Sequence, residues 1–316
     1  ASMRLDYLAA LAGIFIALQG KANGELDKFL ASSVQTALVS FSVGLIAISL
    51  YGLSHRESRA GLTRLRNALK AKVIPYWGIT GGLLGGTFIT MQSFLVPKVG
   101  VAILSVGYIA GQTVCSLFID QIGLTGGGKK AISSARIWAA TITIIAVLVS
   151  VFDRLNSASL TLFSVVLSIF SGGIVALHRA LNGRVNEITL QSSATTIVNF
   201  IMGTAFLAMV FLFLILTNST TWSPLPEKPL WIYTGGLTGV LYIAFSAKVV
   251  QHIGVLHFTL FSVGGQLVGS LLLDWLLPTT NDGISLFLIF GILLTFLGVI
   301  VGGVSNSSTP KPAKPK

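Results

Sequence analysis

The sequence predicts an all-α polytopic membrane protein in which ten transmembrane helices form two inverted five-helix repeats. Three observations predict this class: the composition, an internal repeat and the distribution of basic residues. Of the 316 residues, 53% are hydrophobic and 10% are charged, whereas soluble domains average about 25% charged residues. The mean hydropathy is +0.84. A chain this apolar indicates helices that are surrounded by lipid.

The internal repeat is clearest in one segment of each half. Gly111–Asp120, with the sequence GQTVCSLFID, returns 154 positions later as Gly265–Asp274, with the sequence GQLVGSLLLD. The longer segments 76–121 and 230–275 align without a gap and share 16 identities in 46 pairs. This similarity predicts two homologous halves in the chain.

The repeat also includes the opening helices, because 13–44 aligns with 172–203 at an offset of 159. We therefore divide the chain into a first five-helix repeat, 1–153, and a second, inverted repeat, 154–304. The remaining residues, 305–316, alternate Pro and Lys, which predicts a disordered, basic, cytoplasmic tail.

Each membrane span needs about 20 apolar residues, and ten segments of the chain meet this requirement. The expected helices are 5–22, 33–53, 74–96, 99–119, 136–152, 160–181, 190–216, 231–250, 254–276 and 285–304.

Basic residues predict the orientation of these helices. If the N-terminus is cytoplasmic, most of the 21 Lys and Arg lie in cytoplasmic loops and tails, six of them between Arg56 and Lys72. This follows the positive-inside rule and places both termini in the cytoplasm. Five spans in each half then insert the second half upside down relative to the first. The net charge of +11 is explained by this orientation, so no nucleic-acid partner is expected.

Both copies of the repeat carry polar residues on one helical face, which we call the polar stripes. Their members, spaced mainly by four residues, are Ser105, Tyr108, Gln112, Ser116 and Asp120 in the first half and Thr259, Ser262, Gln266, Ser270 and Asp274 in the second. Polar groups that face hydrocarbon cost several kcal/mol, so the stripes face helices or water. Two interpretations remain open: hydrogen bonds between helices, each about 0.6–2 kcal/mol, or a solute pathway.

Asp120 and Asp274 end their stripes near helix C-termini, where the helix dipole disfavours negative charge. A loop cation could compensate Asp120, and the candidates are Lys129, Lys130 and Arg136. Alternatively, the two carboxylates act in gating or proton coupling, one at each end of a pathway.

The first helix of each half carries a second polar group. Gln19 and Asn23 correspond to His178 and Asn182 in the repeat, and Arg179 follows His178. These side chains could contact a solute or a proton, or His178 and Arg179 could snorkel to the cytoplasmic surface. If they line a cavity, an anionic or zwitterionic solute is favoured.

Other chemistries have no motif in the sequence. The single cysteine, Cys115, lies in an apolar segment, and no His, Cys, Asp or Glu cluster has metal-ligand spacing. No phosphate-binding loop and no Ser-His-Asp arrangement is present. We therefore expect no enzyme activity, no cofactor and no metal site.

Three motifs occur in both halves, and together they carry a family resemblance. They are Ala-Leu-Gln/His-x3-Asn-Gly, Trp-x2-Thr-Gly-Gly-Leu and Gly-Gln-x3-Ser-x3-Asp, beginning at Ala17, Trp77 and Gly111 and again at Ala176, Trp231 and Gly265. In these motifs the chain resembles the YdcZ-type inner-membrane exporters of the drug/metabolite transporter superfamily. The resemblance implies a solute cavity between the first four helices of each half, with the fifth and tenth helices outside it.

The leading hypothesis is a secondary transporter of the bacterial plasma membrane. It would move a small metabolite or drug-like solute by alternating access, as an exporter coupled to protons or to exchange, and as a monomer in the lipid bilayer. The alternatives are a translocator of lipid-linked head groups and a non-transporting membrane scaffold for envelope assembly.

Overall fold

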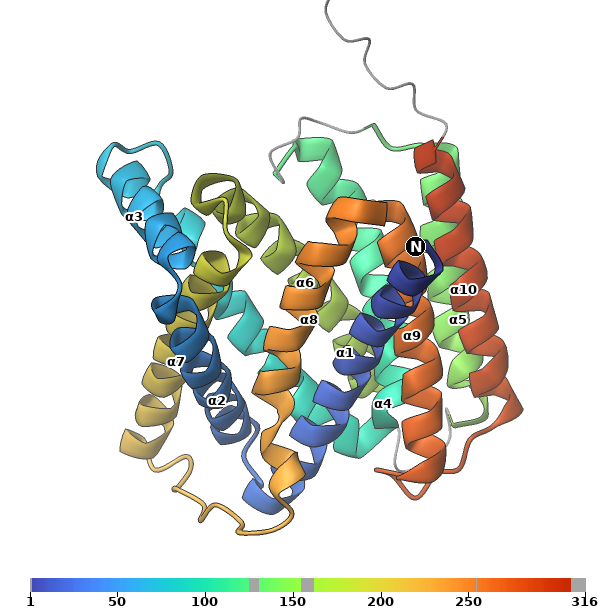
Figure 1. Cartoon of the computed structure of the whole chain (residues 1–316). Coiled ribbons are helices and arrows are strands. Elements are labelled where there is room, and N and C mark those ends of the chain that lie inside the picture. The colour runs from blue at the N-terminus through green and yellow to red at the C-terminus, as the bar shows by residue number, and fades with distance from the viewer. Residues whose placement is uncertain (1, 125–130, 155–161, 254, 308–316) are drawn as a thin grey trace, which may run out of the picture.

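The computed structural model describes residues 2–124, 131–154, 162–253 and 255–307, and it contains no strand within these ranges (Figure 1). Residues 308–316 of the predicted tail lie outside the described residues. The helices are α1 (Ser2–Leu30), α2 (Ser33–Ser54), α3 (Arg56–Lys70), α4 (Gly81–Ile122), α5 (Ser134–Ser150), α6 (Leu162–Thr189), α7 (Ser192–Leu216), α8 (Gly235–Ile253), α9 (Val255–Leu276) and α10 (Leu286–Ser307). Short 3-10 helices span Tyr76–Ile79, Phe152–Arg154 and Leu230–Tyr233.

Eight segments of the described residues are long and apolar enough to cross a membrane. One of them, Tyr76–Ile122, has 47 residues, which is enough for two spans. It joins the helices expected at 74–96 and 99–119. The apolar part of α8, Gly235–Ser246, is shorter than the eight. The chain is thus a multi-pass, all-helical membrane protein.

The helix α4 is interrupted at Gly100, where φ is 84° and ψ is 169°. This backbone conformation is essentially restricted to glycine. Pro97, just before it, lacks the N–H group that a continuous helix would use. The helix restarts at Val101, so its first N–H groups need acceptors from elsewhere.

The helices α1 and α6 continue beyond the ends expected at 22 and 181, to Leu30 and Thr189. The expected ends were wrong because polar residues in these segments are satisfied inside the protein. Lys21 forms an i,i+4 ion pair with Glu25 at 2.8 Å. Such pairs stabilise a helix.

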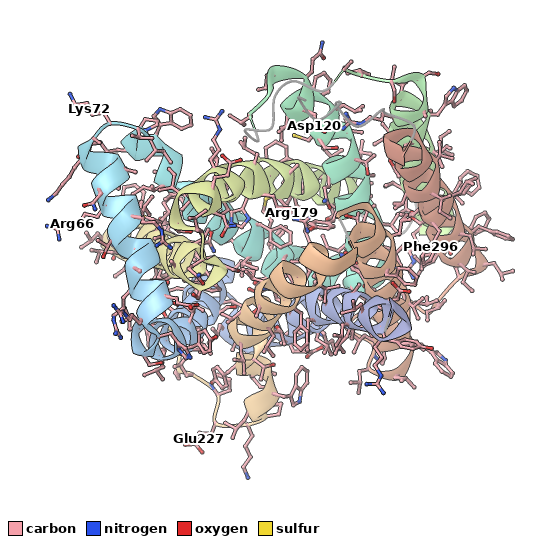
Figure 2. The ribbon with its side chains drawn as sticks, turned by 45° about the horizontal axis from the view of Figure 1, so that its top comes forward. Arg66, Lys72, Asp120, Arg179, Glu227 and Phe296 are labelled. Carbon is pink, nitrogen blue, oxygen red and sulfur yellow. The ribbon has the colours of Figure 1, made fainter. Side chains whose placement is uncertain are left out.

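The basic segment after α2, expected as a loop, forms the amphipathic helix α3. Its apolar face is buried through Leu65, which packs with Ile74 and Val185. Arg66 and Lys72 point away from the rest of the molecule (Figure 2). The helix lies at the same end of the molecule as the N-terminus (Figure 1). A helix with this division of apolar and charged faces is suited to a membrane surface.

The two halves of the sequence pack against each other along their length. The helix α1 lies against α8 and α9, α6 lies against α4, and α2 lies against α7. The helices α5 and α10 pack together at one side of the molecule (Figure 1). The opening helix of each half therefore lies against helices of the other half.

Close contacts between the halves occur in reciprocal pairs. A Cβ atom added at Gly172 would overlap the carbonyl oxygen of Tyr108, and one added at Gly13 would overlap that of Ser262. These two contacts correspond in the repeat. Three more pairs of contacts correspond in the same way. Gly44 packs against Phe200 as Gly203 packs against Phe41, Gly235 packs against Asn23 as Gly81 packs against Asn182, and Gly239 packs against Gln19 as Gly85 packs against His178. Such reciprocity is the property of an interface around a two-fold axis.

Candidate functional site

The polar stripe of α9 is buried against α4. Ser262, Gln266 and Ser270 are all buried, with Ser270 0% exposed. The hydroxyl oxygens of Ser270 and Ser105 lie 2.7 Å apart. Ser270 also donates to the carbonyl oxygen of Gln266 in its own helix. No polar group of this stripe therefore needs to face lipid.

Asp274, at the end of this stripe, caps the second part of α4. Its carboxylate accepts hydrogen bonds from the N–H groups of Val101 at 3.1 Å and Ala102 at 2.8 Å. The missing side chain of Gly100 makes room, because a Cβ atom there would lie 3.0 Å from Oδ2 of Asp274. The partial positive charge at a helix N-terminus favours such a carboxylate. Local sequence patterns contain no signal for this compensation, because the partners lie in the other half.

Lys21 forms hydrogen bonds between two elements at the same end of the molecule. Its ammonium group donates to the carbonyl oxygen of Leu277 at 2.5 Å and to the hydroxyl of Thr279 at 3.0 Å. Lys21 is only 4% exposed. It connects α1 to the segment that follows α9, so contacts between the two halves join them at this end.

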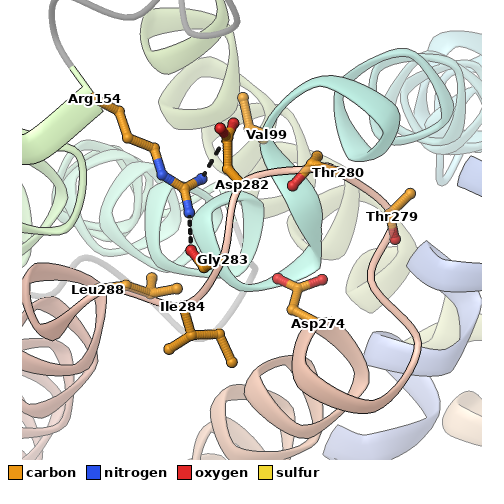
Figure 3. A pocket seen from close by; sticks show the side chains of 9 residues that line it. All are labelled: Val99, Arg154, Asp274, Thr279, Thr280, Asp282, Gly283, Ile284 and Leu288. Carbon is orange, nitrogen blue, oxygen red and sulfur yellow. Dashed lines mark hydrogen bonds and ion pairs between the residues drawn. The ribbon is translucent and has the colours of Figure 1, made fainter.

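A small pocket remains beside Asp274 (Figure 3). Arg154 lies across it and donates to the carbonyl oxygen of Gly283 at 2.6 Å. The same guanidinium lies 4.0 Å from the carboxylate of Asp282. The pocket is thus partly filled by an ion pair that does not include Asp274.

The equivalent end of the first stripe has different contacts. Asp120 accepts a hydrogen bond from Arg136 at 2.6 Å, and Arg136 is one of the three cations expected for it. Lys129 and Lys130, the other two, lie outside the described residues. Gln112 and Ser116 are half-buried, and Ser116 donates within its own helix to Thr113 at 2.9 Å. Two stripes that are equivalent in sequence are therefore bonded differently.

Amide side chains in the opening helices form two clusters. His178 Nε2 lies 2.7 Å from Asn199 Oδ1 and 2.9 Å from Asn182 Nδ2. In the other half, Asn23 donates to Gln92 at 3.0 Å and is 0% exposed. Asn199 and Gln92 do not fall on a repeated polar stripe, so their sequence positions alone favour packing or interfacial roles. One available signal was that Asn199 occupies the repeat position of another polar residue, Ser40.

Tyr108 contacts Arg179 and also lines a small pocket between the halves. Its hydroxyl accepts a hydrogen bond from Arg179 at 3.0 Å, and its ring packs on Phe88 with a centroid distance of 5.6 Å. Tyr108 also lines a small pocket between the halves together with Gln266. The other lining residues are Ile16, Gly20, Phe88, Gln92, Val101, Leu104 and Ser105.

The predicted pathway residues are therefore only partly gathered in one place. Tyr108 and Gln266 share the central pocket, whereas Gln19 packs at Gly239 of α8. Asp274 lines the pocket in Figure 3, at one end of the molecule. In the described part of the chain, no three His, Cys, Asp or Glu side chains are grouped as a metal site would require.

Long apolar helices with buried polar residues between two similar halves define a multi-pass membrane protein with a polar interior. A family model described as "Putative inner membrane exporter, YdcZ" matches residues 6–149 and 163–301. The chain belongs to this YdcZ family of inner-membrane exporters, which are transporters and not enzymes. The match confirms the resemblance seen in the motifs and the inner membrane as the location.

Two further comparisons concern individual proteins. No curated protein matches the chain. A solved chain described as "Crystal structure of protein" is similar with a TM-score of 0.56 and 14% identity, over 98% of this chain and 99% of that chain. At this identity the likeness extends to the fold alone.

Proposed function

We propose that this protein is a secondary transporter that exports a small solute across the bacterial inner membrane by alternating access, coupled to protons or to exchange. In this proposal α4 contributes two spans and α8 one, which gives ten spans in two inverted repeats. Both termini are cytoplasmic. Family membership supports the transport class, and the reciprocal glycine contacts support a two-fold relation between the halves.

The observation that carries the proposal is the difference between the two ends. In the repeat, Asp120 corresponds to Asp274, and Val255 and Leu256 correspond to Val101 and Ala102. Asp274 accepts hydrogen bonds from the N–H groups of Val101 and Ala102, where α4 of the opposite half restarts. Asp120 instead accepts a hydrogen bond from Arg136. A symmetric packing would bond both carboxylates alike.

We infer that the two carboxylates exchange roles during transport. In the opposite conformation, Asp274 leaves the N–H groups of Val101 and Ala102. Asp120 leaves Arg136 and accepts hydrogen bonds from the first N–H groups of α9, at Val255 and Leu256. Gly254, the counterpart of Gly100, lies outside the described residues.

Equivalent sequences make the two conformations similar in energy, because each closed end uses one carboxylate and one helix restart. A hydrogen bond to a charged group contributes about 1.5–3 kcal/mol. Breaking such bonds at one end while forming them at the other leaves a small difference. A small difference keeps both conformations populated, as alternating access requires.

The basic helix α3 lies at the same end as Asp120 (Figure 2). By the positive-inside rule this end is cytoplasmic. The conformation described is then closed to the outside at Asp274 and open toward the cytoplasm. The pathway runs past Gln112 and Ser116 at the open end and past Gln266 and Ser270 at the closed end.

Thiol labelling from each side of the membrane tests this function. In a Cys115→Ala background, Ser116→Cys should react with a membrane-impermeant reagent from the cytoplasmic side. Ser270→Cys should react from the external side, and more slowly, because it is buried in this conformation. Ser150→Cys, buried at the contact between α5 and Gly291 of α10, is the unreactive control. If neither pathway cysteine reacts from any side, the stripes are dry and the protein does not transport through them.

A further inference from the structure

We propose that Arg179, supported by Tyr108 and Tyr242, binds the carboxylate of the transported solute, which is therefore a small molecule with a single carboxylate group. This inference rests on the proposed transport function and adds the chemical class of the solute. It is carried by the position, the contacts and the charge of Arg179.

Arg179 lies deep in the protein. The helix α6 continues ten residues beyond it to Thr189, which is about 15 Å at 1.5 Å per residue. Its guanidinium is directed across the molecule, to Tyr108 of α4 at 3.0 Å and Tyr242 of α8 at 3.1 Å. Snorkelling to the end of the helix therefore does not describe this side chain, because its end points to other helices.

The surroundings of Arg179 leave it accessible. Arg179 is exposed, although its partner Tyr108 is only 4% exposed. Figure 2 shows Arg179 near the centre of the molecule, between α6 and α8. A guanidinium facing hydrocarbon at this depth would be costly. Its exposed surface is therefore expected to face water and not lipid.

The charge of Arg179 has no acidic partner in the described part of the chain. All ten Asp and Glu residues lie in the described ranges, and none of them forms an ion pair with Arg179 there. The contacts to Tyr108 and Tyr242 use only one nitrogen, Nη2. The N–H groups on Nε and Nη1 are not used by the two tyrosines, and each can donate a hydrogen bond to a carboxylate oxygen.

The single positive charge of Arg179 matches a solute that carries a single negative charge. His178, the neighbouring titratable group, is bonded to Asn199 and Asn182. A second negative charge on the solute would therefore have no partner at this site. Since Tyr108 also lines the central pocket with Gln266, a carboxylate on Arg179 would leave the rest of the solute beside the polar stripe of α9.

Thermal unfolding of the purified protein tests the inference with matched ligands. The probes are propionate, benzoate and leucine, each compared with its primary amide, with choline as a cation. The carboxylates should raise the unfolding midpoint in a saturable way, and the amides and choline should not. At a hundredfold excess over Kd, binding to the folded state alone lowers the unfolding equilibrium constant about 100-fold.

Substitutions at Arg179 test whether the carboxylates bind at this side chain. Arg179→Gln should weaken carboxylate binding about 10- to 100-fold, as expected for losing a charged hydrogen-bond partner, and Arg179→Lys should weaken it less. Arg184→Gln is the control, because Arg184 lies on the same helix but donates to Leu124 at 2.6 Å. If Arg179→Gln fails to fold, Tyr242→Phe, which removes one supporting hydroxyl, should still weaken binding while leaving the midpoint without ligand nearly unchanged.

The inference is overturned if no carboxylate stabilises the wild-type protein, if acids and amides act equally, or if Arg179→Gln retains the effect. The labelling of Ser116→Cys and Ser270→Cys is independent of the solute. Reactive cysteines together with binding of amides or choline would therefore reject the carboxylate and keep the transport function. Unreactive cysteines would instead reject the transport function.

Discussion

Gly100 and Asp274 act as one structural unit although they belong to different halves of the chain. Glycine allows the backbone conformation that ends the first part of α4. It also leaves room for the carboxylate that satisfies the first N–H groups of the second part. Each residue thus explains the presence of the other. A helix break inside a membrane protein is tolerated only when the freed backbone groups find partners.

Gly100→Ala should destabilise the protein by about 1–3 kcal/mol, because alanine is strained in this backbone conformation. Its Cβ atom would also press on the carboxylate of Asp274, 3.0 Å away. The measurement is the thermal unfolding midpoint in detergent. Gly283→Ala is the control: no atom lies within 4 Å of a Cβ atom there, so a change below about 0.5 kcal/mol is expected. Equal midpoints for the two variants would show that Gly100 is not under this constraint.

At the scale of helices, the contact between α4 and α6 depends on small residues. Gly172 of α6 faces the backbone of Tyr108 so closely that no side chain fits. The next residue, Gly173, meets only Cys115, at 3.7 Å from its Cβ atom. One helix therefore presents a constrained and an unconstrained glycine side by side.

Gly172→Ala should cost about 1–3 kcal/mol or more, because backbone atoms would have to move. Gly173→Ala should be neutral or slightly stabilising, since alanine favours helix over glycine. Unfolding midpoints of the two variants, measured in the same detergent, make the comparison. Similar losses at both positions would contradict the close backbone approach between α4 and α6.

At the scale of the whole molecule, much could be predicted from local patterns. The apolar segments predicted helices, and repeated residues such as Gln112 and Gln266 predicted two related halves. Arg136 was expected among the partners of Asp120. The sequence pattern predicted helix ends wrongly where polar residues form hydrogen bonds with groups that are distant in the sequence. Asn23 and Asn182 read as helix ends, yet each is hydrogen-bonded to another helix, at Gln92 and at Asn199.

The asymmetry between the two ends could not be predicted, because it is a property of one conformation. Asp120 and Asp274 occupy equivalent repeat positions, so the sequence expects equivalent contacts for them. Which carboxylate lies on a helix restart depends on packing between residues more than 150 positions apart. Sequence periodicity contains no information about such a choice between two packings.

The most direct test of alternating access is whether the hydrogen bonds of Asp274 control access to the pathway from both ends of the molecule. In the Cys115→Ala background, Asp274→Asn should weaken the closed end and raise the labelling rate of Ser270→Cys about tenfold, as expected for losing a charged hydrogen-bond acceptor. The labelling rate of Ser116→Cys should fall in the same variant, because the population shifts to the opposite conformation. Asp282→Asn, in the same pocket, is the control and should change neither rate. A rise at Ser270→Cys with no fall at Ser116→Cys would mean local loosening, and it would contradict exchange between two conformations.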